Sequence, residues 1–164
     1  MMQKAVILSR KRPSNWRFAG DCGYNLPSMI RSEFLYMKHF EPKEAYEFLK
    51  KNPNSIFVDC RSEMEYLFVG HPAGAILVSW NDGPNWEINP DFVAHVKKAA
   101  SVDRPIVLIC RSGNRSLDAG RALEEAGFTK VYNVLHGFEG ELDESHHRGS
   151  RTGWRYDGLP WEQC

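Results

Sequence analysis

The chain has 164 residues, a length that fits one domain with a buried core of its own. Its 21 basic and 21 acidic residues cancel, so the overall charge favours neither a nucleic-acid partner nor a membrane surface. The four cysteines, Cys22, Cys60, Cys110 and Cys164, form no CxxC pair and have no histidine at metal-ligand spacing. We therefore expect free thiols in a reducing compartment and no bound metal.

The two ends of the chain are expected to lie outside the main domain, residues 36–144. Residues 1–35 are interpreted as an N-terminal extension of unknown role. Its basic, acid-free start is also typical of transit peptides, but a solvated extension is the preferred interpretation. Residues 145–164 are predicted to be a loop-like tail whose Trp154 and Trp161 pack back on the domain. Because no apolar run approaches the ~20 residues that span a bilayer, we expect a soluble, cytoplasmic protein without a membrane partner.

Apolar periodicity and turn residues predict helices that alternate with strands. In chain order they are helix 42–50, strand 56–60, helix 62–70, strand 75–78, helix 89–100, strand 105–109, helix 116–126, strand 131–135 and a last short helix at 137–142. Pro42 suits the first turn of its helix, Ser62 and Glu65 have capping-box spacing, and Gly127 follows its helix in the C-cap position. This alternation indicates an α/β fold with a parallel sheet covered on both faces, in which ligands bind beyond the carboxyl ends of the strands.

Cys110 stands at such a carboxyl end, after the apolar run 106–109 and just before the helix that begins at Ser116. A loop in this position points backbone N–H groups inward, and the helix N-terminus adds about half a positive charge. Arg111 and Arg115 add two permanent cations. A buried cysteine is often just a small hydrophobic residue. Here the neighbouring groups stabilise the thiolate, which is the reactive form, so Cys110 is the candidate nucleophile.

Three stretches together resemble the rhodanese (sulfurtransferase) superfamily in their order and spacing. They are Val58-Asp59-Cys60-Arg61 followed by Glu65-Tyr66, then Gly70-His71-Pro72-Ala73-Gly74-Ala75, then Cys110-Arg111-Ser112-Gly113-Asn114-Arg115-Ser116. The likeness covers about residues 40–143. It implies a single rhodanese domain, a three-layer α/β/α fold with a five-stranded parallel sheet, and an active Cys110 that carries sulfur as a persulfide without a cofactor.

The resemblance also implies a reaction. The Cys110 thiolate takes the outer sulfur of a small donor such as thiosulfate, and a thiol, cyanide or a protein cysteine accepts it. The substrate-binding residues would be those of the loop, namely Arg111, Ser112, Gly113, Asn114, Arg115 and Ser116. Arg111 and Arg115 are the candidates for holding the thiosulfate oxygens.

Three further candidate residues, Asp59, Cys60 and Arg61, lie at the carboxyl end of the strand at 56–60. Asp59 and Arg61 are interpreted as structural supports of the strand end. The family fold places that strand beside the one that ends at Cys110, so Cys60 is a possible resolving thiol in a Cys60–Cys110 disulfide. An inert core thiol is the preferred interpretation of Cys60.

Loop length separates the two chemistries known on this fold. Four residues lie between Cys110 and Arg115, whereas related phosphatases look like Cys-x5-Arg. One residue adds about 3.3–3.6 Å of chain, so the shorter loop suits sulfur better than phosphate. Two alternatives stay open: a phosphatase or arsenate reductase of the same fold, and a persulfide carrier or redox-sensing module for one protein partner. Trp80 and Trp86 either line the pocket at the cysteine loop or anchor their own loop to the core.

Overall fold

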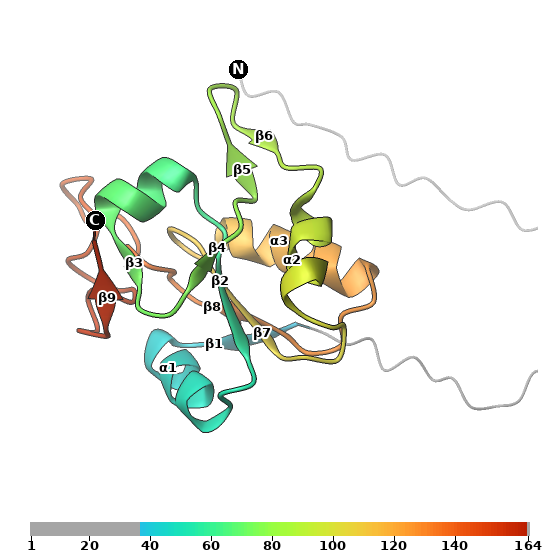
Figure 1. The fold of residues 1–164 in the computed structure, drawn as a ribbon. Coiled ribbons are helices and arrows are strands. Elements are labelled where there is room, and N and C mark those ends of the chain that lie inside the picture. The colour runs from blue at the N-terminus through green and yellow to red at the C-terminus, as the bar shows by residue number, and fades with distance from the viewer. Residues whose placement is uncertain (1–36, 164) are drawn as a thin grey trace, which may run out of the picture. The chain divides into compact units, whose positions relative to one another are not determined.

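The computed structural model describes residues 37–163 (Figure 1). The predicted N-terminal extension, Cys22 and Cys164 lie outside the described residues. The elements are β1 (Lys38–Phe40), α1 (Pro42–Lys51), β2 (Ile56–Asp59), the π-helix η1 (Glu65–Val69), β3 (His71–Pro72), β4 (Ile76–Leu77), β5 (Asn81–Asp82), β6 (Glu87–Ile88), α2 (Phe92–Ala99), β7 (Ile106–Ile109), α3 (Asn114–Glu125), β8 (Val131–Val134) and β9 (Trp161–Glu162).

Five strands form a parallel sheet in the order β1-β8-β7-β2-β4, which confirms the predicted α/β architecture. β2 and β7 are neighbours, with Asp59 opposite Ile109. The residues that follow them, Cys60 and Cys110, therefore leave the same edge of the sheet side by side. Two short antiparallel pairs, β3 with β9 and β5 with β6, complete the strand pairing of the described residues.

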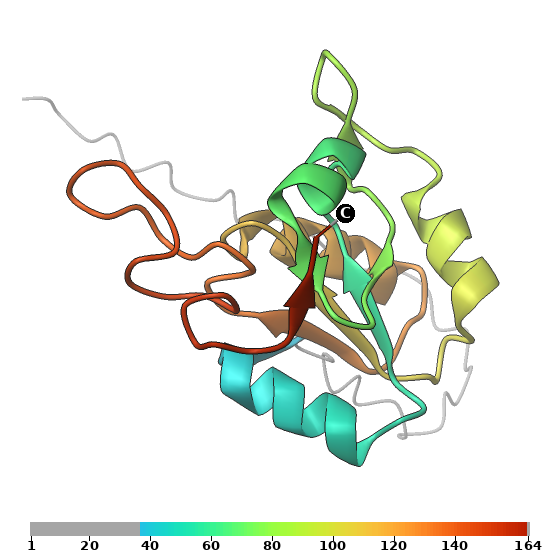
Figure 2. The same cartoon turned by 60° about the vertical axis from the view of Figure 1, so that its left-hand side comes forward.

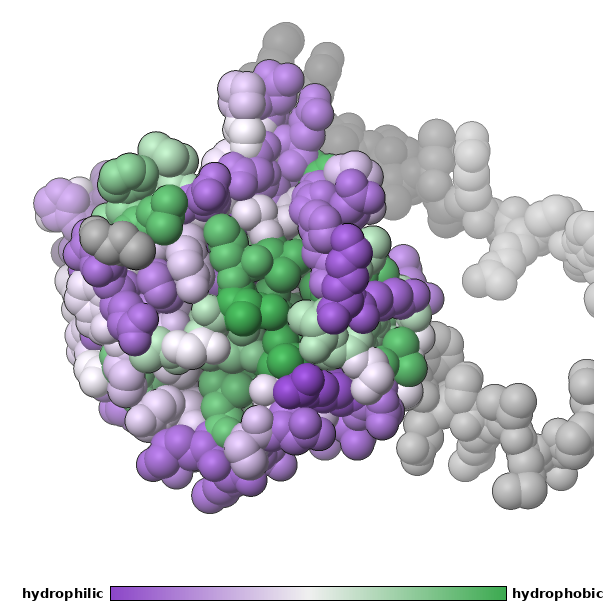
Figure 3. All heavy atoms as spheres, viewed as in Figure 1, coloured by the Kyte–Doolittle hydropathy of each residue, from purple (hydrophilic) through white to green (hydrophobic). Residues whose placement is uncertain are grey.

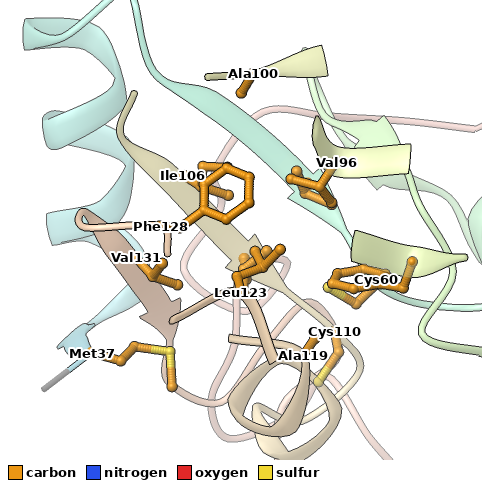
Figure 4. Close-up of a cluster of buried hydrophobic side chains, with 13 residues drawn as sticks. Met37, Cys60, Val96, Ala100, Ile106, Cys110, Ala119, Leu123, Phe128 and Val131 are labelled. Carbon is orange, nitrogen blue, oxygen red and sulfur yellow. The ribbon is translucent and has the colours of Figure 1, made fainter. Parts of the chain in front are cut away.

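The core has two halves, one on each face of the sheet. Alternate residues of β7 point to opposite faces, as the pleat requires. Ile106 and Leu108 pack in a cluster with side chains of α2 and α3, part of which is drawn in Figure 4. Val107 and Ile109 pack in a second cluster with side chains of α1 and of the C-terminal segment. Figure 1 shows α2 and α3 together on one side of the sheet and α1 on the other, so the three-layer prediction is confirmed.

The local signals for helix starts are confirmed at two places. Pro42 is the first residue of α1, and the predicted capping box is present: the Ser62 N–H donates to Glu65 Oε2 at 3.0 Å and the Glu65 N–H donates to Ser62 Oγ at 3.2 Å. The helix that follows is a π-helix at Glu65–Val69, and Gly70 ends it with a φ of 92°.

The predicted last helix at residues 137–142 is wrong. The chain forms turns there, and Gly137 and Gly140 have φ angles of 62° and 81°. Its backbone groups bond to other loops: the Phe138 N–H donates to the Cys110 carbonyl at 2.8 Å, and the Trp154 N–H donates to the Gly137 carbonyl at 2.8 Å. A helix would have required the Gly137 carbonyl to accept from the Glu141 N–H, which instead donates to Thr152 Oγ1 at 3.0 Å.

The C-terminal segment contributes side chains to the core. Trp154 is 1% exposed, lies in the cluster on the α1 face, and donates its indole N–H to the Pro160 carbonyl at 2.9 Å. Trp161, in β9, is 40% exposed and contacts the Phe138 ring edge-on. Figure 2 shows the segment, in orange to red, curving back so that β9 runs beside the short green strand β3.

Candidate active site

The cysteine loop connects β7 to α3 at the carboxyl edge of the sheet. Cys110 follows β7 directly, and α3 begins at Asn114, so the helix N-terminus faces back toward the cysteine. Gly113 is the N-cap residue, with a φ of 97°, a conformation that favours glycine. An added Cβ at Gly113 would lie 3.3 Å from the His136 backbone nitrogen, so this turn also packs tightly against the end of β8. The loop is thus held in a closed form.

Two donors point at the cysteine sulfur. The Gly113 N–H and the Ser116 hydroxyl each lie 3.2 Å from Cys110 Sγ. The hydroxyl is also 3.2 Å from the Gly113 carbonyl, and its single proton can serve one of these acceptors at a time. A negative charge on sulfur draws the proton toward Sγ, because hydrogen bonds to charged acceptors are the stronger ones. The predicted inward-facing amide at Gly113 is thus in place, and Ser116 adds a side-chain donor.

The second loop behind the cysteine keeps the first in position. Gly137 is so close that an added Cβ would collide with the carbonyl oxygen of Cys110. The Phe138 and Glu139 N–H groups donate to the carbonyls of Cys110 and Arg111 at 2.8 and 3.0 Å. These bonds turn both carbonyl oxygens away from the sulfur, which leaves the donors to face it.

Arg115 is not free to hold an anion, because it forms a two-pronged ion pair with Glu65. Both guanidinium–carboxylate distances are 2.7 Å, and each side chain is 14% exposed. Burial by itself would raise the pKa of Glu65, but Arg115 and the donors of Ser62 outweigh it and lower this pKa to about 2. Burial by itself would lower the pKa of Arg115, but the interactions with Glu65 and Cys110 outweigh burial and raise this pKa. The pair is therefore charged and holds the loop to η1.

The other predicted loop residues lie farther out. Arg111 and Asn114 are exposed and Ser112 is half-buried. Ser112 and Asn114 line a pocket of about 250 Å³ together with His39, Asn133 and other residues of the β1 and β8 side. Arg111 is therefore the cation of the loop that remains available to a substrate anion.

Asp59 and Arg61 form a fully buried ion pair beside the loop. Arg61 Nη2 lies 2.7 Å from Asp59 Oδ2 and 2.6 Å from the Gly70 carbonyl, and its guanidinium stacks on the Phe138 ring at 4.2 Å. Both side chains are 0% exposed. These bonds connect the end of β2 to the end of η1 and to the loop behind Cys110, which is the geometry of a structural support.

Cys60 and Cys110 are both free thiols in the same core cluster, as Figure 4 shows. Burial raises the pKa of the Cys60 thiol well above its ordinary value, and the neighbouring Cys110 adds to the effect. A neutral thiol is a poor nucleophile, so this environment opposes a resolving role. The Cys60–Cys110 disulfide stays a hypothesis.

The hairpin formed by β5 and β6 reaches the other side of the loop. The Arg115 guanidinium lies 5.3 Å from the centre of the Trp86 ring, and Trp86 is 48% exposed. Trp80 instead packs against the core and contacts Phe92 edge-on. The two tryptophans thus differ: Trp80 anchors the hairpin, and Trp86 lies at the edge of the site.

Sequence reasoning missed Glu65 as a site residue. Its capping-box spacing from Ser62 was a signal for a helix start, but nothing near it in the chain pointed to Arg115. Within residues 37–163, no three His, Cys, Asp or Glu side chains gather as they would around a metal ion. Across the same residues, no helix combines the length and apolar character needed to cross a membrane.

A parallel α/β sheet with a cysteine held between a strand end and a helix N-terminus defines a class of domains built for sulfur or anion chemistry at that cysteine. The chain belongs to the rhodanese-like family, whose model, described as "Rhodanese-like domain", matches residues 41–143.

The chain is also similar to individual proteins. The uncharacterized protein RC0915 of Rickettsia conorii is 32% identical over 73% of this chain and 92% of its own length. Thiosulfate sulfurtransferase GlpE of Pseudomonas putida is 32% identical over 66% of this chain and 84% of its own length. The crystal structure of Rv0390 from M. tuberculosis is 42% identical, with a TM-score of 0.72, and the match covers 79% of this chain and 99% of that one.

Proposed function

We propose that this protein is a sulfurtransferase that carries sulfur as a persulfide on Cys110. The observation that carries the proposal is the pair of donors, Gly113 N–H and Ser116 Oγ–H, each 3.2 Å from Cys110 Sγ at the N-terminus of α3. Such donors stabilise negative sulfur, whether thiolate or persulfide, in a site closed to bulk water. The likeness to a thiosulfate sulfurtransferase supports the same chemistry.

In the proposed reaction, the Cys110 thiolate attacks the outer sulfur of thiosulfate. The new Sγ–S bond forms as the bond between the two thiosulfate sulfurs breaks, and sulfite leaves with the electron pair. An acceptor such as cyanide or a thiolate then takes the outer sulfur, and the electrons of the Sγ–S bond return to Cys110. Arg111, the exposed cation of the loop, is the proposed contact for the donor oxygens. The reaction fits a reducing, cytoplasmic setting and requires no cofactor.

Replacing Cys110 tests the proposal. After incubation with thiosulfate, we expect the wild-type chain to gain the mass of one sulfur atom, located on Cys110, and to pass it to cyanide. Cys110→Ser should lose both properties while its circular dichroism and urea unfolding remain native. Cys60→Ser is the matched control at the neighbouring buried thiol and should still acquire the sulfur. Sulfur transfer by Cys110→Ser would refute the proposal.

A persulfide carrier for one protein partner is the second candidate, and the burial of Cys110 favours it. Cys110 is 1% exposed, so a substrate reaches the sulfur only when the loop or the side chains above it move. Rapid formation of one persulfide per chain, combined with slow turnover of thiosulfate and cyanide, would identify a carrier. A phosphatase reaction is less favoured, because the loop from Cys110 to Arg115 is one residue shorter than in the related phosphatases and Arg115 is paired with Glu65. Failure to hydrolyse an aryl phosphate checks this.

A further inference from the structure

Two segments flank the cysteine loop and meet at Arg115. Glu65 of η1 binds its guanidinium at 2.7 Å, and Trp86 of the β5–β6 hairpin lies 5.3 Å from it. The Glu63 backbone N–H donates a hydrogen bond to Asp82 Oδ2 at 3.3 Å, and this bond joins the two segments directly. The exposed side chains of this border are called the rim, and they are Glu63, Met64, Phe68, Asp82, Trp86 and Glu87.

The rim carries negative charge without compensation from its own segments. The sequence has no lysine or arginine between Arg61 and Lys97, a stretch that includes both η1 and the hairpin. Glu63, Asp82 and Glu87 are exposed. Arg115, which lies between the two segments, is already paired with Glu65. The local field therefore attracts cationic partners and repels anionic ones.

The rim also exposes large apolar side chains. Met64, the residue just before η1, and Phe68 within it are 63% and 65% exposed. Figure 3 shows hydrophobic, green surface at the upper left, where Figure 1 draws η1, and the purple and white hairpin at the top. Exposed apolar side chains next to charged ones are typical of protein-binding surfaces, whereas a small anion makes no favourable contact with apolar side chains.

A pocket lies between the two parts of the rim. It has a volume of about 320 Å³ and is lined by the carboxylates of Glu63 and Asp82, by the aliphatic side chains of Leu77 and Val78, and by Ser79, Asn89 and His95. Hydrogen bonds from Gly83 and Glu63 outweigh burial and lower the pKa of Asp82, so this carboxylate stays ionised. A pocket lined by both aliphatic and acidic residues matches a lysine or arginine side chain, whose apolar stem ends in a cation.

We infer that the physiological sulfur acceptor is a protein that presents a cysteine within a basic segment, and that this segment docks on the rim. The inference rests on the proposed function, because it concerns the second half of that reaction. The acceptor thiol loses its proton to solvent, and its thiolate attacks the outer sulfur of the Cys110 persulfide. A new S–S bond forms on the acceptor, the bond to Cys110 Sγ breaks, and its electron pair restores the Cys110 thiolate. The rim brings the acceptor thiolate to an otherwise closed loop.

Two synthetic peptides test the inference. Each has one cysteine and the same length, one with lysines and the other with glutamates at the same flanking positions. The full chain is first converted to the Cys110 persulfide, and single-turnover transfer to each peptide is followed by mass spectrometry at pH 8. We expect the basic peptide to react about tenfold faster at low ionic strength, with the difference shrinking in 0.5 M salt.

The double variant Glu63→Gln/Glu87→Gln should lose most of this preference while it still acquires one sulfur per chain on Cys110. Glu47→Gln/Glu125→Gln removes two exposed carboxylates from α1 and α3 and should keep the preference. Equal rates for the two peptides, or an unaltered preference in Glu63→Gln/Glu87→Gln, would overturn the docking inference. If no persulfide forms on Cys110, the proposed function itself has failed, and this outcome is seen before any peptide is added.

Discussion

In the proposed reaction, Cys110 combines two conditions that usually oppose each other, deep burial and negative charge on the sulfur. At 1% exposure the sulfur has almost no water to solvate it. Its stabilisation must come from fixed donors, and the Gly113 amide and the Ser116 hydroxyl occupy the positions that water would take. Because these donors are already oriented, charge on the sulfur costs little reorganisation. A persulfide in the same loop is sheltered from solvent thiols by the same burial.

Ser116→Ala is expected to slow persulfide formation about ten- to a hundredfold, because a hydrogen bond to a charged acceptor contributes about 1.5–3 kcal/mol. The rate is measured by the appearance of the added sulfur in the intact mass after mixing with thiosulfate. Ser112→Ala, at the half-buried serine of the same loop, is the matched control and should react at close to the wild-type rate. A wild-type rate in Ser116→Ala would show that the hydroxyl does not act on the sulfur.

At the level of elements, η1 and the β5–β6 hairpin hold the loop from outside. The π-helix is a single turn, and its capping box orients Glu65 so that the carboxylate receives Arg115 as well as the donors of Ser62. One carboxylate thus closes the start of a helix and binds the loop of the candidate nucleophile. Short π-helical turns often mark functional sites. Here η1 follows β2 in the chain and lies beside the cysteine loop.

The Glu65–Arg115 pair predicts a defined pH dependence. The folded-state pKa of Glu65 is about 2, below its ordinary value of 4.5, so the pair stabilises the fold fully above about pH 4.5. As the pH falls from there toward 2, this contribution is lost. Glu65→Gln should lower the free energy of unfolding by about 1–3 kcal/mol at pH 7, and the difference from wild type should shrink toward zero near pH 2.

Urea unfolding of both chains at pH 7, 4.5 and 2.5 measures this difference. Glu63→Gln, an exposed neighbour of the same type, should change the free energy by less than about 0.5 kcal/mol at every pH. A gap between wild type and Glu65→Gln that stays constant from pH 7 to 2.5 would contradict the assigned ion pair.

At the level of the whole molecule, the C-terminal segment is part of the core although it lies beyond the family match at residues 41–143. The Trp154 ring packs against Phe57 of β2 and Tyr46 of α1, with ring centres 5.1 and 5.9 Å apart. Backbone bonds from Trp154 and Arg155 reach the loop behind Cys110. The segment thereby supports the active-site loop from behind.

Trp154→Ala should lower the free energy of unfolding by about 3–5 kcal/mol, the usual cost of truncating a fully buried aromatic side chain. Trp161→Ala is the matched control, and because Trp161 is 40% exposed its effect should be clearly smaller. Urea midpoints and slopes measure both. Equal losses for the two variants would mean that Trp154 is not a core residue of the folded chain.

Much of the fold and the centre of the site could be predicted from the sequence, because their signals are local. Pro42 at a helix start, the Ser62–Glu65 capping box and the apolar run before Cys110 each depend on residues a few positions apart. The cysteine loop is equally local: the strand, Gly113 and the helix start that shape it are adjacent in the chain.

The tertiary structure alone decided which distant groups meet. Arg115 was predicted as an anion contact, but it pairs with Glu65, 50 residues away, once the sheet brings η1 beside the loop. The expected last helix gave way to turns because Gly137 and Gly140 have positive φ angles and because the Gly137 carbonyl bonds to the Trp154 N–H. Short-range patterns specify elements through dihedral preference and capping, whereas ion pairs and loop contacts depend on distances that exist only after the sheet has assembled.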